Sequence, residues 1–229
     1  MSREGGTSGR GESGLPEGSE TDDIETGADE AREEIGEEFE RPPDVPRWDD
    51  EYLDEVAERL LFNYDLERDY RIEGERFDLY GRMEVHSEKH FFHPALSFAQ
   101  HRFDEHLFAR RVGRLSVEDI DRLVELGHRL SEEWIAPDEE HYSTDFTFVT
   151  IAPELPGKVI DRIDGFRERT LLKYGYHGHY EINLVAVAPE REELVASEEA
   201  DVARAFGVWE SIERAEPGLL GLLARRLQL

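Results

Sequence analysis

The spacing of apolar and polar residues divides the second part of the chain into regular elements. Apolar residues recur at helical spacing over residues 52–61, which predicts a first helix. Residues 64–72 and 77–86 then alternate between apolar and polar positions, and a Glu-Gly-Glu turn at residues 73–75 joins them. Two alternating runs joined by such a turn are typical of a β-hairpin, and the mixed charges on its polar side predict cross-strand ion pairs.

The later segments combine helices with apolar strands. Ser116 and Asp119 resemble a capping box at the start of a helix that runs to Trp134. Residues 144–152 are dense in aromatic and β-branched side chains, which predicts a buried strand. The other expected elements are a strand near residues 107–112, a helix from Pro156 that ends before Gly175, a strand over residues 179–188, a helix over residues 200–212 and a leucine-rich closing piece over residues 219–227.

A hairpin followed by alternating strands and helices predicts an α+β fold in a single domain. We expect one mixed sheet that starts with the antiparallel hairpin, with helices packed on it. Residues 47–229 form this single α+β domain in our interpretation. Residues 1–46 are rich in Gly, Ser, Glu and Asp and poor in aromatic and branched side chains, so we expect a disordered acidic tail there.

The charge of the chain indicates an adaptation to salt. It carries 55 acidic and 27 basic residues, a formal net charge of −28, and only three of the basic residues are lysines. At molar salt the Debye length falls to about 3 Å, so neighbouring carboxylates hardly repel one another. An acid-rich composition that keeps Arg and avoids Lys is therefore typical of a halophilic cytoplasm. Nucleic-acid binding is disfavoured by this charge but not excluded, because a local Arg patch would be compatible with it.

Several classes of protein are excluded by what the sequence lacks. There are no cysteines, which removes disulfides, thiolate zinc sites and cysteine nucleophiles. Residues 1–36 contain no apolar core of a secretory signal. The longest apolar stretches, such as residues 184–189, fall far below the ~20 residues that span a bilayer. We therefore expect a soluble protein with no membrane span, located in the cytoplasm.

No complete catalytic motif is present. Gly157-Lys158 lacks the first glycine and the hydroxyl of a phosphate-binding P-loop. Asp78, Glu84 and His86 faintly resemble the Asp…Glu-x-Lys arrangement of divalent-metal nucleases, but an ion-paired hairpin face explains them better. Five histidines lie close together with two acids, and without a ligand spacing we interpret them as hydrated or paired side chains rather than as a metal site. These residues are His86, His90, His93, His101 and His106, with Asp104 and Glu105.

Polar side chains open two otherwise apolar strands. On the later strand His179 and Glu181 share a face, and His177 precedes them. His141 and Asp145 open the earlier strand. If the two strands are parallel, their polar starts meet at one end of the sheet and these five residues form one cluster. A histidine beside a carboxylate is suited to general-base catalysis or metal binding, whereas the alternative is that these groups satisfy one another's hydrogen bonds.

Three stretches of the sequence are distinctive, namely EHYSTDFTFV, DGFRERTLLKYGYHGHYEINLVAVAPE and DRLVELGHRLSEEW. They resemble an uncharacterised domain-of-unknown-function family of haloarchaea, and the resemblance covers residues 49–209. It implies a salt-adapted, archaeal source and a single domain. It supplies no activity, cofactor or catalytic residue.

Two functions of different classes are compatible with these patterns. The first is a non-catalytic binding or interaction module of a halophilic cytoplasm, which binds a small ligand, a protein partner or a second copy of itself. The alternative is a metal-dependent hydrolase or nuclease with His, Asp and Glu ligands. The alternative predicts that His177, His179, Glu181 and one of His141 or Asp145 converge within ligand distance. The sequence alone indicates no substrate, cofactor or oligomeric state.

Overall fold

The computed structural model describes residues 41–43, 45–88, 100–136, 138 and 140–210, without the side chains of residues 86–88, 100 and 101. All of these belong to the second of two compact units, Arg41–Leu229. Several expectations lie outside the described residues. They concern the acidic tail up to residue 40, the leucine-rich piece at residues 219–227, His90, His93 and the side chains of His86 and His101.

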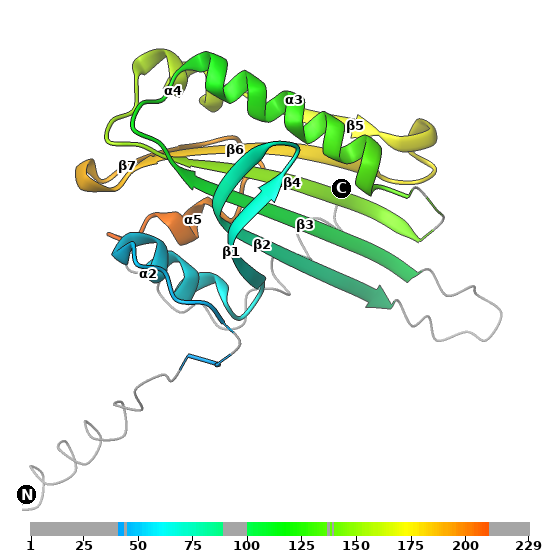
Figure 1. The fold of residues 1–229 in the computed structure, drawn as a ribbon. Helices are drawn as coiled ribbons and strands as arrows, with labels where there is room; N and C mark the ends of the chain where they lie inside the picture. The colour runs from blue at the N-terminus through cyan, green and yellow to red at the C-terminus, as the bar shows by residue number, and fades with distance from the viewer. Residues whose placement is uncertain (1–40, 44, 89–99, 137, 139, 211–229) are drawn as a thin grey trace, which may run out of the picture. The chain divides into compact units, whose positions relative to one another are not determined.

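A mixed sheet of seven strands lies at the centre of the described part of this unit (Figure 1). Across it the order is β1-β2-β3-β4-β6-β5, and β7 pairs with the second half of β6. β1, β2 and β3 are antiparallel neighbours, whereas β3, β4 and β6 run parallel. The expected mixed sheet that starts with an antiparallel hairpin is therefore confirmed. The strands are β1 (Asp65–Ile72), β2 (Glu75–Glu88), β3 (Gln100–Arg111), β4 (His141–Ile151), β5 (Glu168–Leu171), β6 (His179–Ala188) and β7 (Glu193–Ala196).

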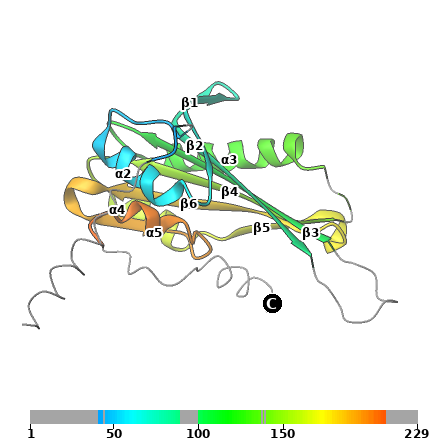
Figure 2. The same cartoon turned by 90° about the horizontal axis from the view of Figure 1, so that it is seen from below.

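Helices cover both faces of the sheet (Figure 1, Figure 2). α3 (Val117–Trp134) and α4 (Gly157–Asp164) pack on one face, which we call the α3 face. α2 (Glu51–Leu60) and α5 (Ala203–Phe206) pack on the opposite face, the α2 face, and the short 3-10 helix η2 (Pro189–Arg191) links β6 to β7. Each face has its own apolar core. The largest buried side chains are Phe77, Phe108, Phe146 and Phe148 on the α3 face and Leu79, Leu107, Ile151 and Phe206 on the α2 face.

The expected helix from Pro156 to Gly175 is wrong beyond Asp164. There the chain forms β5 and the 3-10 helix η1 (Leu172–Gly175), because β5 pairs with the first half of β6 and extends the sheet. β7 was not expected from the sequence either. Of the expected helix over residues 200–212, the structure describes residues 200–210, and within these only the four residues of α5 are α-helical.

One extra residue in β4 changes the direction of its first side chain. His141 and Ser143 pair with consecutive residues of β3, so Tyr142 between them is a β-bulge. A bulge shifts the alternation of side chains by one position. His141 therefore shares the α3 face with Thr144, and its Nε2 lies 2.9 Å from the Thr144 hydroxyl oxygen. Asp145 faces the α2 side of the sheet, beside the buried polar residues of β6.

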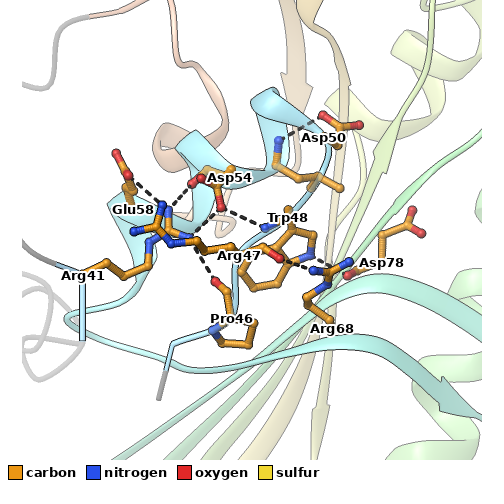
Figure 3. Close-up of polar contacts among 10 residues, drawn as sticks. Arg41, Pro46, Arg47, Trp48, Asp50, Asp54, Glu58, Arg68 and Asp78 are labelled. Atoms are coloured by element: carbon orange, nitrogen blue, oxygen red, sulfur yellow. Dashed lines mark hydrogen bonds and ion pairs between the residues drawn. The ribbon is translucent and has the colours of Figure 1, made fainter. Parts of the chain in front are cut away.

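Arg41 attaches the start of the described chain to α2 (Figure 3). Its side chain is only 3% exposed, and its guanidinium donates to Asp54 Oδ1 at 2.6 Å and to Glu58 Oε1 at 3.1 Å. The backbone N–H of Trp48 donates to the same Asp54 oxygen at 2.9 Å. The expected tail runs to residue 46, whereas these contacts place Arg41 against the domain.

Candidate functional site

The five polar residues expected to cluster are divided between the two faces of the sheet. β4 and β6 are parallel, so their starts lie side by side, with Asp145 opposite Glu181. Asp145, His179 and Glu181 lie together on the α2 face. The bulge directs His141 to the α3 face, where its Nδ1 is 2.8 Å from the carbonyl oxygen of His177 in the turn before β6. The structure thus brings three of the five residues together and directs His141 to the other face, where it contacts the backbone of His177.

The group on the α2 face is held together by its own polar contacts. Nε2 of His179 is 3.3 Å from Oε1 of Glu181, and Nε of Arg169 lies 3.5 Å from the same oxygen. A guanidinium nitrogen of Arg169 is also 3.4 Å from Nδ1 of His179. The cavity beside these side chains has a volume of about 60 Å³, which is room for a few water molecules but not for a substrate. These contacts agree with the alternative interpretation of the sequence, in which these polar groups satisfy one another's hydrogen bonds and form no functional site.

Three carboxylates lie in one row across neighbouring strands of this face. Glu105 of β3 is the partner of Asp145, and Asp145 is the partner of Glu181. Each of the three residues is more than nine-tenths buried. Within the part of the chain that the structure describes, however, no group of three His, Asp or Glu side chains is placed to hold a metal ion. The convergence that a metal-dependent enzyme would require is therefore not found in that part.

The larger polar site is a cavity of about 480 Å³ on the α3 face, which we call the α3 pocket. It lies between the end of α3 and the strands β2, β3 and β4. Its inner lining consists mainly of aromatic rings and imidazoles, which are mostly buried, and its rim consists mainly of charged side chains. The inner side chains are Tyr80, His106, Trp134, His141 and Thr144, and the rim contains Arg82, Glu84, Arg102, Asp104 and Ala136.

His106 forms the aromatic centre of the α3 pocket. Its Nδ1 is 2.8 Å from the Tyr80 hydroxyl oxygen, its ring stacks on Phe146 with 5.4 Å between ring centres, and Trp134 meets it edge-on at 4.8 Å. Burial, with a smaller contribution from Arg82, lowers the pKa of His106 to about 4. The imidazole is therefore neutral at neutral pH. Its Nε2 makes no hydrogen bond with the residues that the structure describes, so it is open to a ligand as donor or acceptor, according to the tautomer.

The charges on the rim of the α3 pocket are paired with one another. The guanidinium of Arg82 is 2.8 Å from Glu84 and 4.0 Å from Asp104. The guanidinium of Arg102 is 3.2 Å from Asp104. The guanidinium of Arg102 is also 3.8 Å from Asp138, so each of the two guanidinium groups of this network is paired with at least one carboxylate.

A larger cavity, of about 730 Å³, lies at the starts of α3 and α4. It is close to the carboxyl ends of the parallel strands β3 and β4, where sheets of this kind often bind ligands. Its charged side chains are exposed, and the buried members of its lining are the apolar Leu115 and Val159. The charged side chains are Arg114, Glu118, Glu154 and Lys158. Because no buried polar group of the described chain faces this cavity, we assign the candidate site to the α3 pocket.

Asp78 and Glu84 do not form a joint site. Oδ2 of Asp78 accepts the backbone N–H of Arg111 at 2.7 Å, at the end of β3. Glu84 lies six residues further along β2, or about 20 Å away at the usual rise of a strand, on the rim of the α3 pocket. An ion pair between Asp69 and Arg76 joins β1 to β2, whereas Asp78 is bound to a backbone group rather than to a cationic side chain.

Sequence reasoning noticed His106 only within a group of histidines, and it missed Tyr80 and Trp134. The sequences of β2 and β3 nevertheless contained a signal for the pocket. Tyr80 and Arg82 are two residues apart on β2, and Asp104 and His106 are two residues apart on its antiparallel neighbour β3. Residues two apart on a strand point to the same side, and the pairing of the two strands places all four side chains on one face. The end of α3 covers part of this face and so closes the pocket. The spacing of residues in the sequence does not predict where the end of α3 lies over the sheet.

The fold and the site define a three-layer α+β domain with a ligand-sized cavity on one face of its sheet. The chain belongs to the family described as Domain of unknown function (DUF8052), whose profile matches residues 49–208. The expected membership of such a family is thereby confirmed, and the haloarchaeal source stays a prediction. No curated protein and no solved structure matches the chain. Among the described residues, none of the helices combines the length and the apolar character needed to cross a membrane.

Proposed function

We propose that this domain is a non-catalytic binding module and that a small ligand occupies the α3 pocket. The observation that carries the proposal is the convergence of buried polar groups from three strands on one cavity. Tyr80, His106, His141 and Thr144 line it, and each is more than nine-tenths buried. A volume of about 480 Å³ falls within the roughly 300–1,000 Å³ of small-molecule sites.

A metal-dependent hydrolase or nuclease has less support. The described residues offer no set of three metal-binding side chains. The acids on the rim of the α3 pocket are engaged with guanidinium groups, and Nδ1 of His106 is engaged with Tyr80. Beside His179 and Glu181 there is too little space for a substrate. Binding without catalysis accounts for more of this geometry.

Blocking the α3 pocket tests the proposal. The variant Ala136→Trp places an indole at the exposed mouth of the pocket, and Glu132→Trp adds the same side chain to an exposed position of α3 as a matched control. We expect at least one of adenosine, AMP, glucose, glutamate and citrate to raise the melting temperature of the wild type and of Glu132→Trp, but not of Ala136→Trp, because a ligand stabilises the folded state that binds it. The absence of any shift, or equal shifts in all three proteins, would contradict the proposal.

We also infer that the protein works in the salt-filled cytoplasm of a haloarchaeon. The net charge of −28 and the small number of lysines support this source. Because salt screens the repulsion between carboxylates, the melting temperature is expected to rise when KCl is increased from low to molar concentration. Thermal melts over a series of KCl concentrations measure this, and a melting temperature that stays constant or falls would count against the inference.

A further inference from the structure

The charges around the α3 pocket restrict the chemistry of its ligand. The guanidinium groups of Arg82 and Arg102 are paired with the carboxylates of Glu84 and Asp104. The His106 imidazole at the centre is neutral at neutral pH, because burial lowers its pKa. An anionic ligand would therefore lose hydration in this pocket without gaining a free cationic partner, and a cationic ligand would have to compete with the two guanidinium groups for their carboxylates. The lining is suited to an uncharged molecule.

Flat aromatic side chains form the inner walls of the pocket. Tyr80 stacks on Tyr70 with 4.1 Å between ring centres, which holds its ring in place. His106 is held between Phe146 and Trp134. Rings that are already fixed present their faces and edges to a ligand with little further loss of conformational freedom. A planar ring is the group that gains most from such walls.

Hydrogen-bonding atoms lie at two depths in the pocket. At the inner end are Nε2 of His106 and the hydroxyl of Thr144, which is itself 2.9 Å from Nε2 of His141. These atoms match the polar edge of a nitrogen heterocycle. At the rim, Arg82 supplies donors and Glu84 supplies acceptors side by side. Hydroxyl groups, which both donate and accept, match this second layer.

We propose that the α3 pocket binds a nucleoside-like ligand, in which an uncharged nitrogen heterocycle is joined to a hydroxylated ring. The heterocycle lies between the aromatic walls with its edge toward His106 and Thr144, and the hydroxyl groups face the charged rim. This inference rests on the proposed function, because it names the ligand class of the same pocket. It goes further in requiring that the ligand is flat and carries no net charge.

Calorimetric titration of the full chain with adenosine tests the inference. We expect the wild type and the control Glu132→Trp to bind adenosine at least as tightly as AMP, because the phosphate finds no free counter-charge. Trp134→Ala is expected to weaken adenosine binding roughly tenfold or more, the loss typical of one base–aromatic contact. Ala136→Trp is expected to abolish binding. Because Ala136→Trp removes no core side chain, it carries the test if Trp134→Ala fails to fold in a circular-dichroism melt.

Three outcomes would overturn the inference. If AMP or citrate binds the wild type while adenosine does not, and Ala136→Trp blocks that binding, the ligand class is wrong and the proposed function stands. If adenosine binds Trp134→Ala and Ala136→Trp with unchanged affinity, adenosine occupies another place. If none of the compounds binds, the nucleoside inference and the proposed function both fail.

Discussion

Replacement of Gly178 with Ala is expected to lower the free energy of unfolding by roughly 3 kcal/mol or more. Gly178 has a φ of +73°, in the region where a side chain costs about 1–2 kcal/mol. The added Cβ would also overlap the backbone carbonyl oxygen of Tyr142 at the β-bulge. Neither backbone segment can turn aside as a flexible side chain would. Chemical denaturation of the two proteins in the same buffer measures the difference.

Gly175, three residues earlier, provides a matched control. Its φ is +89°, and among the described residues no atom lies within 4 Å of the position that a Cβ would take. Gly175→Ala is therefore expected to lose only the backbone contribution of about 1–2 kcal/mol. Equal losses in the two variants would show that the close approach of Gly178 to Tyr142 does not affect stability.

Replacement of Arg41 with Gln is expected to lower the free energy of unfolding by about 2 kcal/mol. Breaking a fully buried ion pair costs about 3–5 kcal/mol. The Arg41 side chain is 3% exposed, but its partners Asp54 and Glu58 are 26% and 55% exposed, which reduces the loss. Arg47→Gln in the same segment is the control, since Arg47 is exposed, and a change of at most about 0.5 kcal/mol is expected there. Similar losses in both variants would contradict a specific role for Arg41.

The loss in Arg41→Gln is expected to depend on pH through Asp54. Burial acts to raise the pKa of Asp54, but the hydrogen bonds from Arg41 and from the Trp48 backbone outweigh burial and hold that pKa below its usual value. A carboxylate with a lowered folded-state pKa stabilises the fold above its unfolded pKa of about 3.9, and this contribution is lost as the pH falls through the folded pKa. The difference between the wild type and the variant should therefore be largest at neutral pH and shrink below about pH 4. A difference that persists unchanged in acid would exclude Asp54 as the responsible partner.

The sequence predicted correctly those helices, turns and strands that are specified by residues within the element itself. The capping box is present, since Ser116 and Asp119 bond each other's backbone N–H groups at the start of α3. The hairpin turn uses the left-handed conformations of Glu73 and Gly74. The apolar character of the two late strands predicted buried strands inside the sheet, and the structure adds that they pair in parallel, which the sequence left open.

Other features depend on partners that the local sequence does not reveal. The four residues of β5 are too few for their alternation to be distinguished from a continuation of α4. The bulge at Tyr142 exists only in relation to the register of β3. Because a shift of one residue moves a side chain to the other face, this bulge separates His141 from Asp145 and divides the predicted cluster. The α3 pocket likewise required Trp134 to be placed over β3 and β4.

The place of β6 inside the sheet determines when the chain can finish folding during its synthesis. β4 emerges from the ribosome before β6, and at that moment it can pair only with β3. Its other edge then presents unsatisfied backbone groups along an apolar strand, which is the kind of surface that promotes aggregation. This edge of β4 is covered only when β6, which ends at Ala188, has been synthesised and has paired with it.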